Sequence, residues 1–123
     1  MKPKVILASQ SPYRKALLEQ VGLDFTAMAP GIDERDLEKN FTGDLHQLAG
    51  YLSEKKTQGL SQLHPSSLII GSDQVLTFKG QTMHKPQSIK EVVERLKILR
   101  NQEHQLRTGL CVSYSGKTFI TTV

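Results

Sequence analysis

The sequence predicts an α/β protein with a mixed, twisted sheet and flanking helices. Short β-branched or apolar runs alternate with segments of helical period, and turn or capping residues lie between them. No internal repeat, low-complexity stretch or linker divides the 123 residues. A chain of this length buries roughly two-thirds of its unfolded surface. We therefore expect residues 1–123 to form a single domain.

The first unit reads as a strand, a tight turn and a helix. Residues 4–8 are β-branched or apolar and predict a strand. Ser11 suits a helix N-cap and Pro12 suits the first helical position. Leu17, Leu18 and Val21 continue the apolar pattern at helical spacing. Gly22 then predicts the end of the helix, because a glycine in the left-handed conformation commonly follows the last helical residue.

The middle of the chain adds two strands and a second helix. Residues 25–29 predict a short strand, and the charged run 32–36 after Pro30-Gly31 predicts an exposed loop. Apolar residues at helical spacing from 45 to 63, with Asp44 as N-cap, predict a helix. Residues 67–76 predict a buried strand that contains a small polar patch, which consists of Ser72, Asp73 and Gln74.

The last third predicts a helix and a hairpin. Ser88 with Glu91 is a capping-box pattern ahead of an amphipathic segment that ends at Leu99. The alternating run 106–114 and the turn at Ser115-Gly116 predict a strand that folds back into residues 118–123. The apolar stripes of all three helices are interpreted as core. The final strand has no charge or proline to protect its edge, so we expect more chain after Val123.

Composition excludes several classes of protein. The longest apolar run is residues 5–8, which is too short for a membrane span or a secretory signal, so a cytoplasmic protein is expected. Cys111 is the single cysteine, and the four histidines lack close pairing, which argues against disulfide and zinc chemistry. The net charge of +4 favours an anionic partner such as phosphate, while the scattered lysines do not form a nucleic-acid track.

Residues 9–15 combine the groups of an anion site. A predicted strand end meets a predicted helix N-terminus there, which offers hydroxyls, unpaired backbone N–H groups and the Arg14 guanidinium. The alternative is structural: Ser11 only caps the helix, and Arg14 is a solvated residue of its first turn. Tyr13 is able to stack on a base, although a tyrosine on a helix surface has simpler explanations.

Carboxylates and lysines elsewhere are further candidates. Carboxylates from separate segments, here Asp33-Glu34 and Asp73, can share a Mg²⁺ ion, or one of them can orient a water. Taken alone, Asp33-Glu34 is more simply a solvated turn, whereas Asp73 follows a core strand, at whose end ligands of α/β sheets bind. Lys56 and Lys85 are candidates for polyphosphate contacts, with solvation as the alternative. Cys111 is interpreted as a small buried hydrophobe.

Together these pieces resemble the Maf family of nucleoside triphosphate pyrophosphatases. The resemblance runs in order along the whole chain and rests on these segments: Leu7-Ala8-Ser9-Gln10-Ser11-Pro12-Tyr13-Arg14, Asp33-Glu34, Lys56, Gly71-Ser72-Asp73-Gln74-Val75, Lys85-Pro86, His104 and Thr108-Gly109. Ser-Asp-Gln in place of the commoner Ala-Asp-Thr, and Tyr13 where many members carry Arg, resemble the branch that acts on 7-methyl-GTP.

The resemblance implies a Maf/ITPase-like architecture and cleavage between the α and β phosphates. It implies that Asp73 is the proton acceptor and that Glu34 and Asp73 hold a divalent cation, Mg²⁺ with Mn²⁺ as the alternative. It further implies that the triphosphate is bound by Ser9, Ser11, Arg14, Lys56 and Lys85. Tyr13 and Gln74 take the specificity positions, where an aromatic ring can stack on a cationic methylated base and an amide can pair with a purine edge.

Two departures from the family pattern leave alternatives open. His84 stands where the family usually has Gly, and family members continue well beyond Val123 into a second lobe that closes the cleft. The chain is then the N-terminal portion of the architecture, without the C-terminal lobe, and its exposed edges favour a homodimer. A catalytically weak or inactive nucleotide-binding fragment with a division-related partner role is the alternative function. A small basic nucleic-acid binder ranks last.

Overall fold

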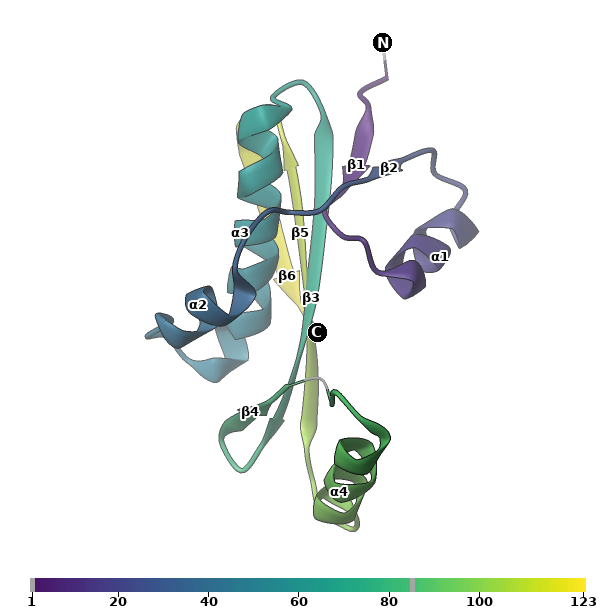
Figure 1. The fold of residues 1–123 in the computed structure, drawn as a ribbon. Helices are drawn as coiled ribbons and strands as arrows, with labels where there is room; N and C mark the ends of the chain where they lie inside the picture. Colours follow the sequence, from purple (N-terminus) through teal and green to yellow (C-terminus); the bar gives the residue numbers. More distant parts are fainter. Residues whose placement is uncertain (1, 85) are drawn as a thin grey trace.

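The computed structural model describes residues 2–84 and 86–123, which form one mixed sheet with helices around it (Figure 1). The strand order is β2-β1-β3-β5-β6, and β4 pairs with the other end of β3. The predicted α/β class is confirmed. The strands are β1 (Val5–Leu7), β2 (Thr26–Ala27), β3 (Leu68–Phe78), β4 (Gln81–Met83), β5 (Gln105–Tyr114) and β6 (Lys117–Thr122).

The parallel part of the sheet is built around β1. β1 pairs in parallel with β2 on one side and with β3 on the other, so the connection from β1 to β2 and the connection from β2 to β3 cross the sheet in opposite directions. Because such crossovers share one hand, their helices fall on opposite faces of the sheet, and α1 (Pro12–Gln20) lies on the face opposite α3 (Leu48–Leu63) (Figure 1). Ser11 caps α1 as predicted, whereas β2 is shorter than the predicted strand 25–29.

The charged run after Pro30-Gly31 is a helix, α2 (Glu34–Lys39), and the prediction of a loop over 32–36 was wrong. Asp33 is its N-cap and accepts a hydrogen bond from the backbone N–H of Asp36 at 3.1 Å. Acidic residues in the first turn and Lys39 in the last complement the helix dipole. The dense charge that suggested a loop therefore stabilises a short helix.

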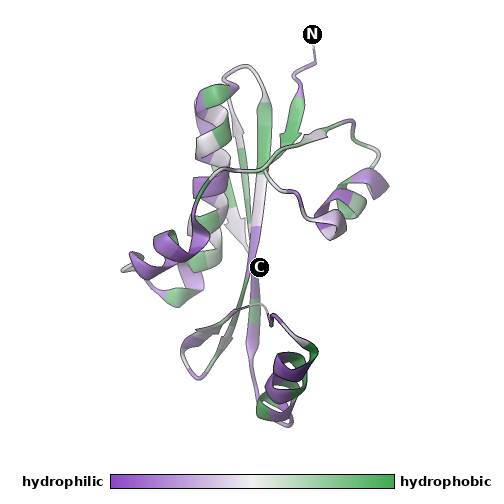
Figure 2. Ribbon diagram, viewed as in Figure 1, coloured by the Kyte–Doolittle hydropathy of each residue, from purple (hydrophilic) through white to green (hydrophobic). Residues whose placement is uncertain are grey.

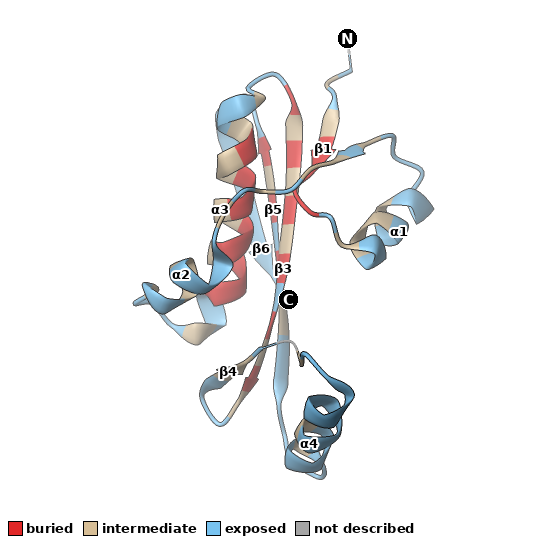
Figure 3. Cartoon of the chain, viewed as in Figure 1, coloured by how far each residue is buried: buried red, intermediate tan, exposed pale blue. Residues whose placement is uncertain are grey.

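The core lies between the sheet and α3 (Leu48–Leu63), which follows a short 3₁₀ turn, η1 (Leu45–Gln47), capped by Asp44. One face of α3 is buried along its length (Figure 3). Two glycines permit the close approach: a Cβ on Gly71 would lie 2.7 Å from the Ser53 carbonyl oxygen, and one on Gly109 would overlap the Ala49 carbonyl. Helix α3 therefore packs its backbone directly against β3 and β5.

Strand β3 connects all parts of the sheet. It pairs with β1 through Leu68–Ile70, with β4 through Leu76–Phe78, and with β5 from Ile69 to Thr77. The predicted turn at Ser115-Gly116 and the turn at Lys79-Gly80 both have positive φ at both residues, which suits tight two-residue hairpins. Residues of β3 alternate strictly between the face toward α3, which is buried, and the opposite face.

Helix α4 (Ile89–Leu99) begins where the sequence predicts, but its apolar stripe is not core. Ser88 accepts a hydrogen bond from the Glu91 backbone N–H at 3.1 Å, and the Glu91 carboxylate accepts one from the Gln87 backbone N–H at 2.6 Å. No residue of α4 or of α1 is buried, and Leu96 is 62% exposed (Figures 2 and 3). Sequence periodicity correctly identified the apolar faces of α1, α3 and α4, but of these three helices only α3 buries its apolar face.

The sheet face that points away from α3 also carries exposed apolar side chains. On β5 the predicted alternation is correct, with Gly109, Cys111 and Ser113 buried toward α3. The face of β5 that points away from α3 carries the alternating apolar residues, and Leu106, Leu110 and Tyr114 among them are exposed. No helix within residues 2–84 and 86–123 is long and apolar enough to cross a bilayer.

Candidate functional site

The centre of the candidate site is the Lys56 ammonium group on α3. Lys56 is 3% exposed, and its Nζ lies 2.9 Å from Oδ1 of Asp73 and 2.7 Å from Oε1 of Glu34. It also donates to the Ser72 carbonyl oxygen at 3.4 Å. Helix α3, strand β3 and the first residue of α2 thus bring one cation and two carboxylates together.

Burial sets the electrostatics of Asp73. Its side chain points toward α3 from β3, and loss of solvent raises the pKa of this carboxyl above its ordinary value. The Lys56 ammonium opposes that rise by attraction and by hydrogen bonding, Glu34 adds to it, and Arg14 opposes it. A carboxylate in this position is more basic than one in water.

Helix α1 contributes its first turn. The Nη2 atom of Arg14 lies 3.9 Å from Oδ1 of Asp73. Ser9 accepts a hydrogen bond from the Ser11 backbone N–H at 3.0 Å, and Ser11 accepts one from the Arg14 backbone N–H at 3.4 Å. Ser11 therefore caps the helix, as one of the two interpretations of this segment predicted. The same turn directs Arg14 toward Asp73.

A cavity of about 320 Å³ lies beside Asp73. It opens along the edge of β3 between the segments that pair with β1 and with β4. Residues from both ends of the molecule line it, and the titratable ones are Arg14, Glu38, Asp73, His84 and Arg95. Such a cavity, with a few converging polar groups, is typical of a binding site for a small molecule.

The two residues expected to set specificity lie apart. Gln74 lines the cavity, points to the sheet face opposite Asp73, and donates from Nε2 to Oγ1 of Thr108 at 3.1 Å. Tyr13 is 69% exposed at the N-terminal turn of α1 and does not line the cavity. The structure thus places Gln74 at the cavity and leaves the Tyr13 ring open to solvent.

The predicted residue Lys85 lies outside the described residues. Its neighbours His84 and Pro86 both line the cavity. Nε2 of His84 lies 3.7 Å from Oε1 of Glu38, so His84 approaches α2 at the cavity. The histidine at position 84, where the family usually has Gly, therefore places an imidazole at the cavity wall.

The donor set at Lys56 fits a divalent cation. Among the residues that the structure describes, no three His, Cys, Asp or Glu side chains cluster as a complete metal site. Mg²⁺, however, is usually held by one or two carboxylates together with substrate phosphates. Glu34 and Asp73 each place an oxygen within 3 Å of the same ammonium nitrogen, so both already converge on one positive charge.

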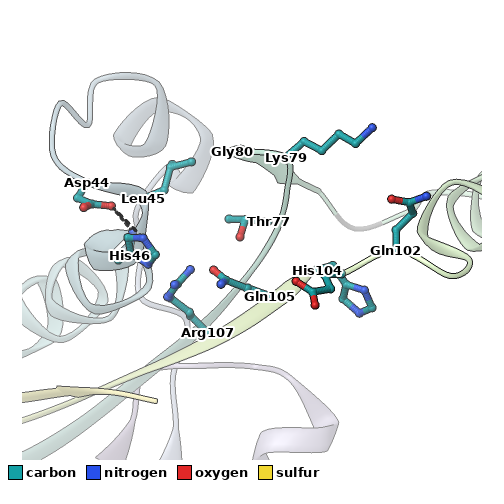
Figure 4. A pocket seen from close by; sticks show the side chains of 11 residues that line it. Asp44, Leu45, His46, Thr77, Lys79, Gly80, Gln102, His104, Gln105 and Arg107 are labelled. Carbon is teal, nitrogen blue, oxygen red and sulfur yellow. Dashed lines mark hydrogen bonds and ion pairs between the residues drawn. The ribbon is translucent and has the colours of Figure 1, made fainter.

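A larger hollow, of about 760 Å³, lies at the far end of the sheet and contains none of the predicted site residues (Figure 4). It lies between η1 and the ends of β3 and β5, with His46, His104 and Arg107 among its walls. His46 donates its backbone N–H to Asp44 at 2.9 Å. His104, although part of the family pattern, therefore lies away from Asp73.

The sequence did not identify Glu38 or Arg95 as cavity residues. Glu38 follows Glu34 by four positions, so a helix over 34–39 would have placed both on one face; the loop prediction hid that signal. Arg95 has no comparable signal, because its position depends on how α4 is oriented against the strands. Cys111 is fully buried, as predicted, and burial raises the pKa of its thiol.

Comparisons with known proteins find relatives that are similar over most of this chain. A 7-methyl-GTP pyrophosphatase of Bartonella henselae is 38% identical over 92% of this chain and 58% of its own length. A 7-methyl-GTP pyrophosphatase of Cupriavidus pinatubonensis is 40% identical over 94% of this chain and 56% of its own length. A nucleoside triphosphate pyrophosphatase of Rhodospirillum rubrum is 36% identical over 94% of this chain and 58% of its own length. The chain thus spans somewhat more than half the length of these relatives.

The fold is similar to that of the Ham1 protein of Staphylococcus aureus, with a TM-score of 0.60, 14% identity, and coverage of 97% of this chain and 68% of that one. This likeness supports the architecture alone. The sequence profile described as Maf-like protein matches residues 4–123, which includes every segment of the site. The chain belongs to the Maf family.

Proposed function

We propose that this chain is a nucleoside triphosphate pyrophosphatase that converts 7-methyl-GTP to the monophosphate and pyrophosphate. The observation that carries the proposal is the convergence of Glu34, Lys56 and Asp73 beside Arg14, with Asp73 and Arg14 lining one cavity. The relatives named 7-methyl-GTP pyrophosphatase support the choice of substrate.

In the proposed reaction, Asp73 accepts a proton from a water whose oxygen attacks the α-phosphorus. The bond between that phosphorus and the oxygen that bridges to the β-phosphate breaks, and pyrophosphate leaves with the bonding electrons. Burial raises the pKa of Asp73 and makes it a better base than an exposed aspartate, while attraction to Lys56 opposes that rise. Orientation by Lys56 also fixes the carboxylate in one position.

The cations have a separate role, which is to offset phosphate charge. Arg14 presents a planar fork to phosphate oxygens from the first turn of α1, and Lys85 is proposed to assist from its loop. Ser9 and Ser11 support that turn. A divalent cation held by Glu34 and Asp73, Mg²⁺ or Mn²⁺, would supply further charge neutralisation when bound.

Base recognition is proposed for Gln74 and Tyr13. Gln74 lies at the cavity with an amide that can pair with a purine edge, and the exposed Tyr13 ring is available to stack on a methylated, cationic base. We expect Gln74→Thr together with Tyr13→Arg to reduce the preference for 7-methyl-GTP over GTP. An unchanged ratio of the two rates would contradict both assignments.

A second candidate is a nucleotide-binding chain without effective catalysis. It is favoured by the exposed sheet face, since poor exclusion of water weakens phosphate chemistry. The division-related partner role, the homodimer, the cytoplasmic location and the assignment as an N-terminal portion stay predictions.

The test is pyrophosphate release from 7-methyl-GTP, GTP, UTP and dTTP with Mg²⁺, for the wild-type chain and Asp73→Asn. We expect release from 7-methyl-GTP to fall at least about a hundredfold in Asp73→Asn, because general base catalysis contributes about that much or more. Asp36→Asn, in exposed α2, is the matched control and should keep full activity. Binding without release would favour the second candidate, and neither binding nor release would overturn both.

A further inference from the structure

Helix α4 directs Arg95, together with the last residue of its apolar stripe, toward the rest of the protein. Every residue of α4 is exposed except Arg95 and Leu99, which are partly buried. Arg95 lines the cavity that Asp73 and Arg14 also line. An arginine turned inward while Leu96 beside it stays exposed indicates that this surface of α4 is directed at the cavity.

The guanidinium of Arg95 is not engaged by an acid. Within the described part of the chain, no carboxylate lies within 4 Å of it. Glu91, one helical turn earlier, is the natural partner by spacing, but its carboxylate accepts the backbone N–H of Gln87. Arg95 therefore has donors available for a ligand at the cavity wall.

The position of Arg95 separates it from the other cations. Arg14 and Lys56 approach Asp73 from α1 and α3, whereas Arg95 comes from α4, on the side of Met83, His84 and Pro86. A triphosphate extends several ångströms from the phosphorus that is attacked. Cations on two sides of one cavity fit an extended polyanion better than a single phosphate.

We propose that Arg95 binds the terminal phosphates of the substrate, so that the phosphate tail lies between Arg14 and Arg95. This inference rests on the proposed function, since it extends the same site. Arg95 is a binding residue here, and it takes no part in proton transfer.

The test measures binding by calorimetry with inorganic tripolyphosphate, which has no base, and with 7-methyl-GMP, which has no phosphate tail. Arg95→Gln should weaken tripolyphosphate binding about tenfold, as expected for loss of hydrogen bonds to a charged group, and should leave 7-methyl-GMP binding unchanged. Arg100→Gln removes the same charge from an exposed position of the same segment and should bind like the wild type. Arg95→Lys should recover part of the loss, and circular dichroism checks the fold of each variant.

The outcomes separate the two proposals. Wild-type protein that binds neither ligand would overturn the proposed function. Binding by the wild type that Arg95→Gln does not change, or that Arg100→Gln weakens equally, would overturn the role of Arg95 alone. A loss confined to 7-methyl-GMP would place Arg95 at the base and would also contradict this inference.

Discussion

The two ends of the molecule differ in how they hold their helices. In the α3 half, which comprises residues 2–75 and 107–123, a helix packs backbone against backbone over two glycines and buries a continuous face. In the α4 end, residues 76–84 and 86–106, the helix leaves its apolar stripe in solvent. The candidate cavity draws residues from both.

The two regions contribute different residues to the candidate site. Asp73 and Lys56, for which roles in the reaction are proposed, belong to the half where packing fixes side chains. Residues of the cavity wall that belong to the α4 end, among them His84 and Arg95, lie on elements with little buried surface. Because local stability follows buried contacts, the residues proposed for catalysis lie in the more stable half, and part of the proposed ligand contact lies in the less stable end.

The largest expected effect breaks the packing of the α3 half. Gly109→Ala places a methyl group against the Ala49 carbonyl of α3, which is backbone and cannot rotate away. We expect a loss of about 3 kcal/mol in the free energy of unfolding, measured by urea denaturation. Thr108→Ala, on the opposite face of the same strand, is the control and should cost less than about 1 kcal/mol. Equal costs at the two positions would refute the close approach.

The second effect compares the same truncation in the two regions. Leu48→Ala in the buried core cluster should cost about 2 to 3 kcal/mol, because it leaves a cavity. Leu96→Ala in α4 should change the free energy of unfolding by less than about 0.5 kcal/mol, since that side chain is already in water. A large loss at Leu96 would show that the stripe of α4 is covered in solution.

The smallest effect concerns pH. The pKa of Asp73 is raised in the folded state, so the folded chain binds more protons than the unfolded chain between the ordinary and the raised value. Stability contributed by Asp73 is present below that window and is lost as pH rises through it, with a slope of at most about 1.4 kcal/mol per pH unit. Asp73→Asn should remove this slope in urea titrations at several pH values. A slope of the opposite sign would mean that Lys56 outweighs burial.

Local signals predicted much of the fold. The caps at Ser11 and Ser88, the turn at Ser115-Gly116 and the buried strand through Asp73 lie where the sequence places them, because each depends on neighbours within a few residues. Helix α2 was missed because charged residues suit both loops and short capped helices. Periodicity correctly marked the apolar stripe of α4, but it cannot tell what covers a stripe.

The candidate site was predicted residue by residue, and its geometry was not. Glu34, Lys56 and Asp73 were named from the family pattern, yet 17 positions separate Lys56 from Asp73 and no local rule brings them to 2.9 Å. That contact follows from the tight packing of α3 over Gly71 and Gly109. Arg95 escaped notice because the orientation of α4 depends on tertiary structure.

The continuous pairing of β3 with β5 has a thermodynamic consequence. These two strands pair from Ile69↔Ser113 to Thr77↔Gln105 and so run from the α3 half into the α4 end. A two-stranded ribbon twists more readily than a wide sheet. A ligand held from both ends must restrict that twist, and the conformational entropy lost is subtracted from its affinity. Stiffening the ribbon before binding would therefore tighten the complex without adding a single contact.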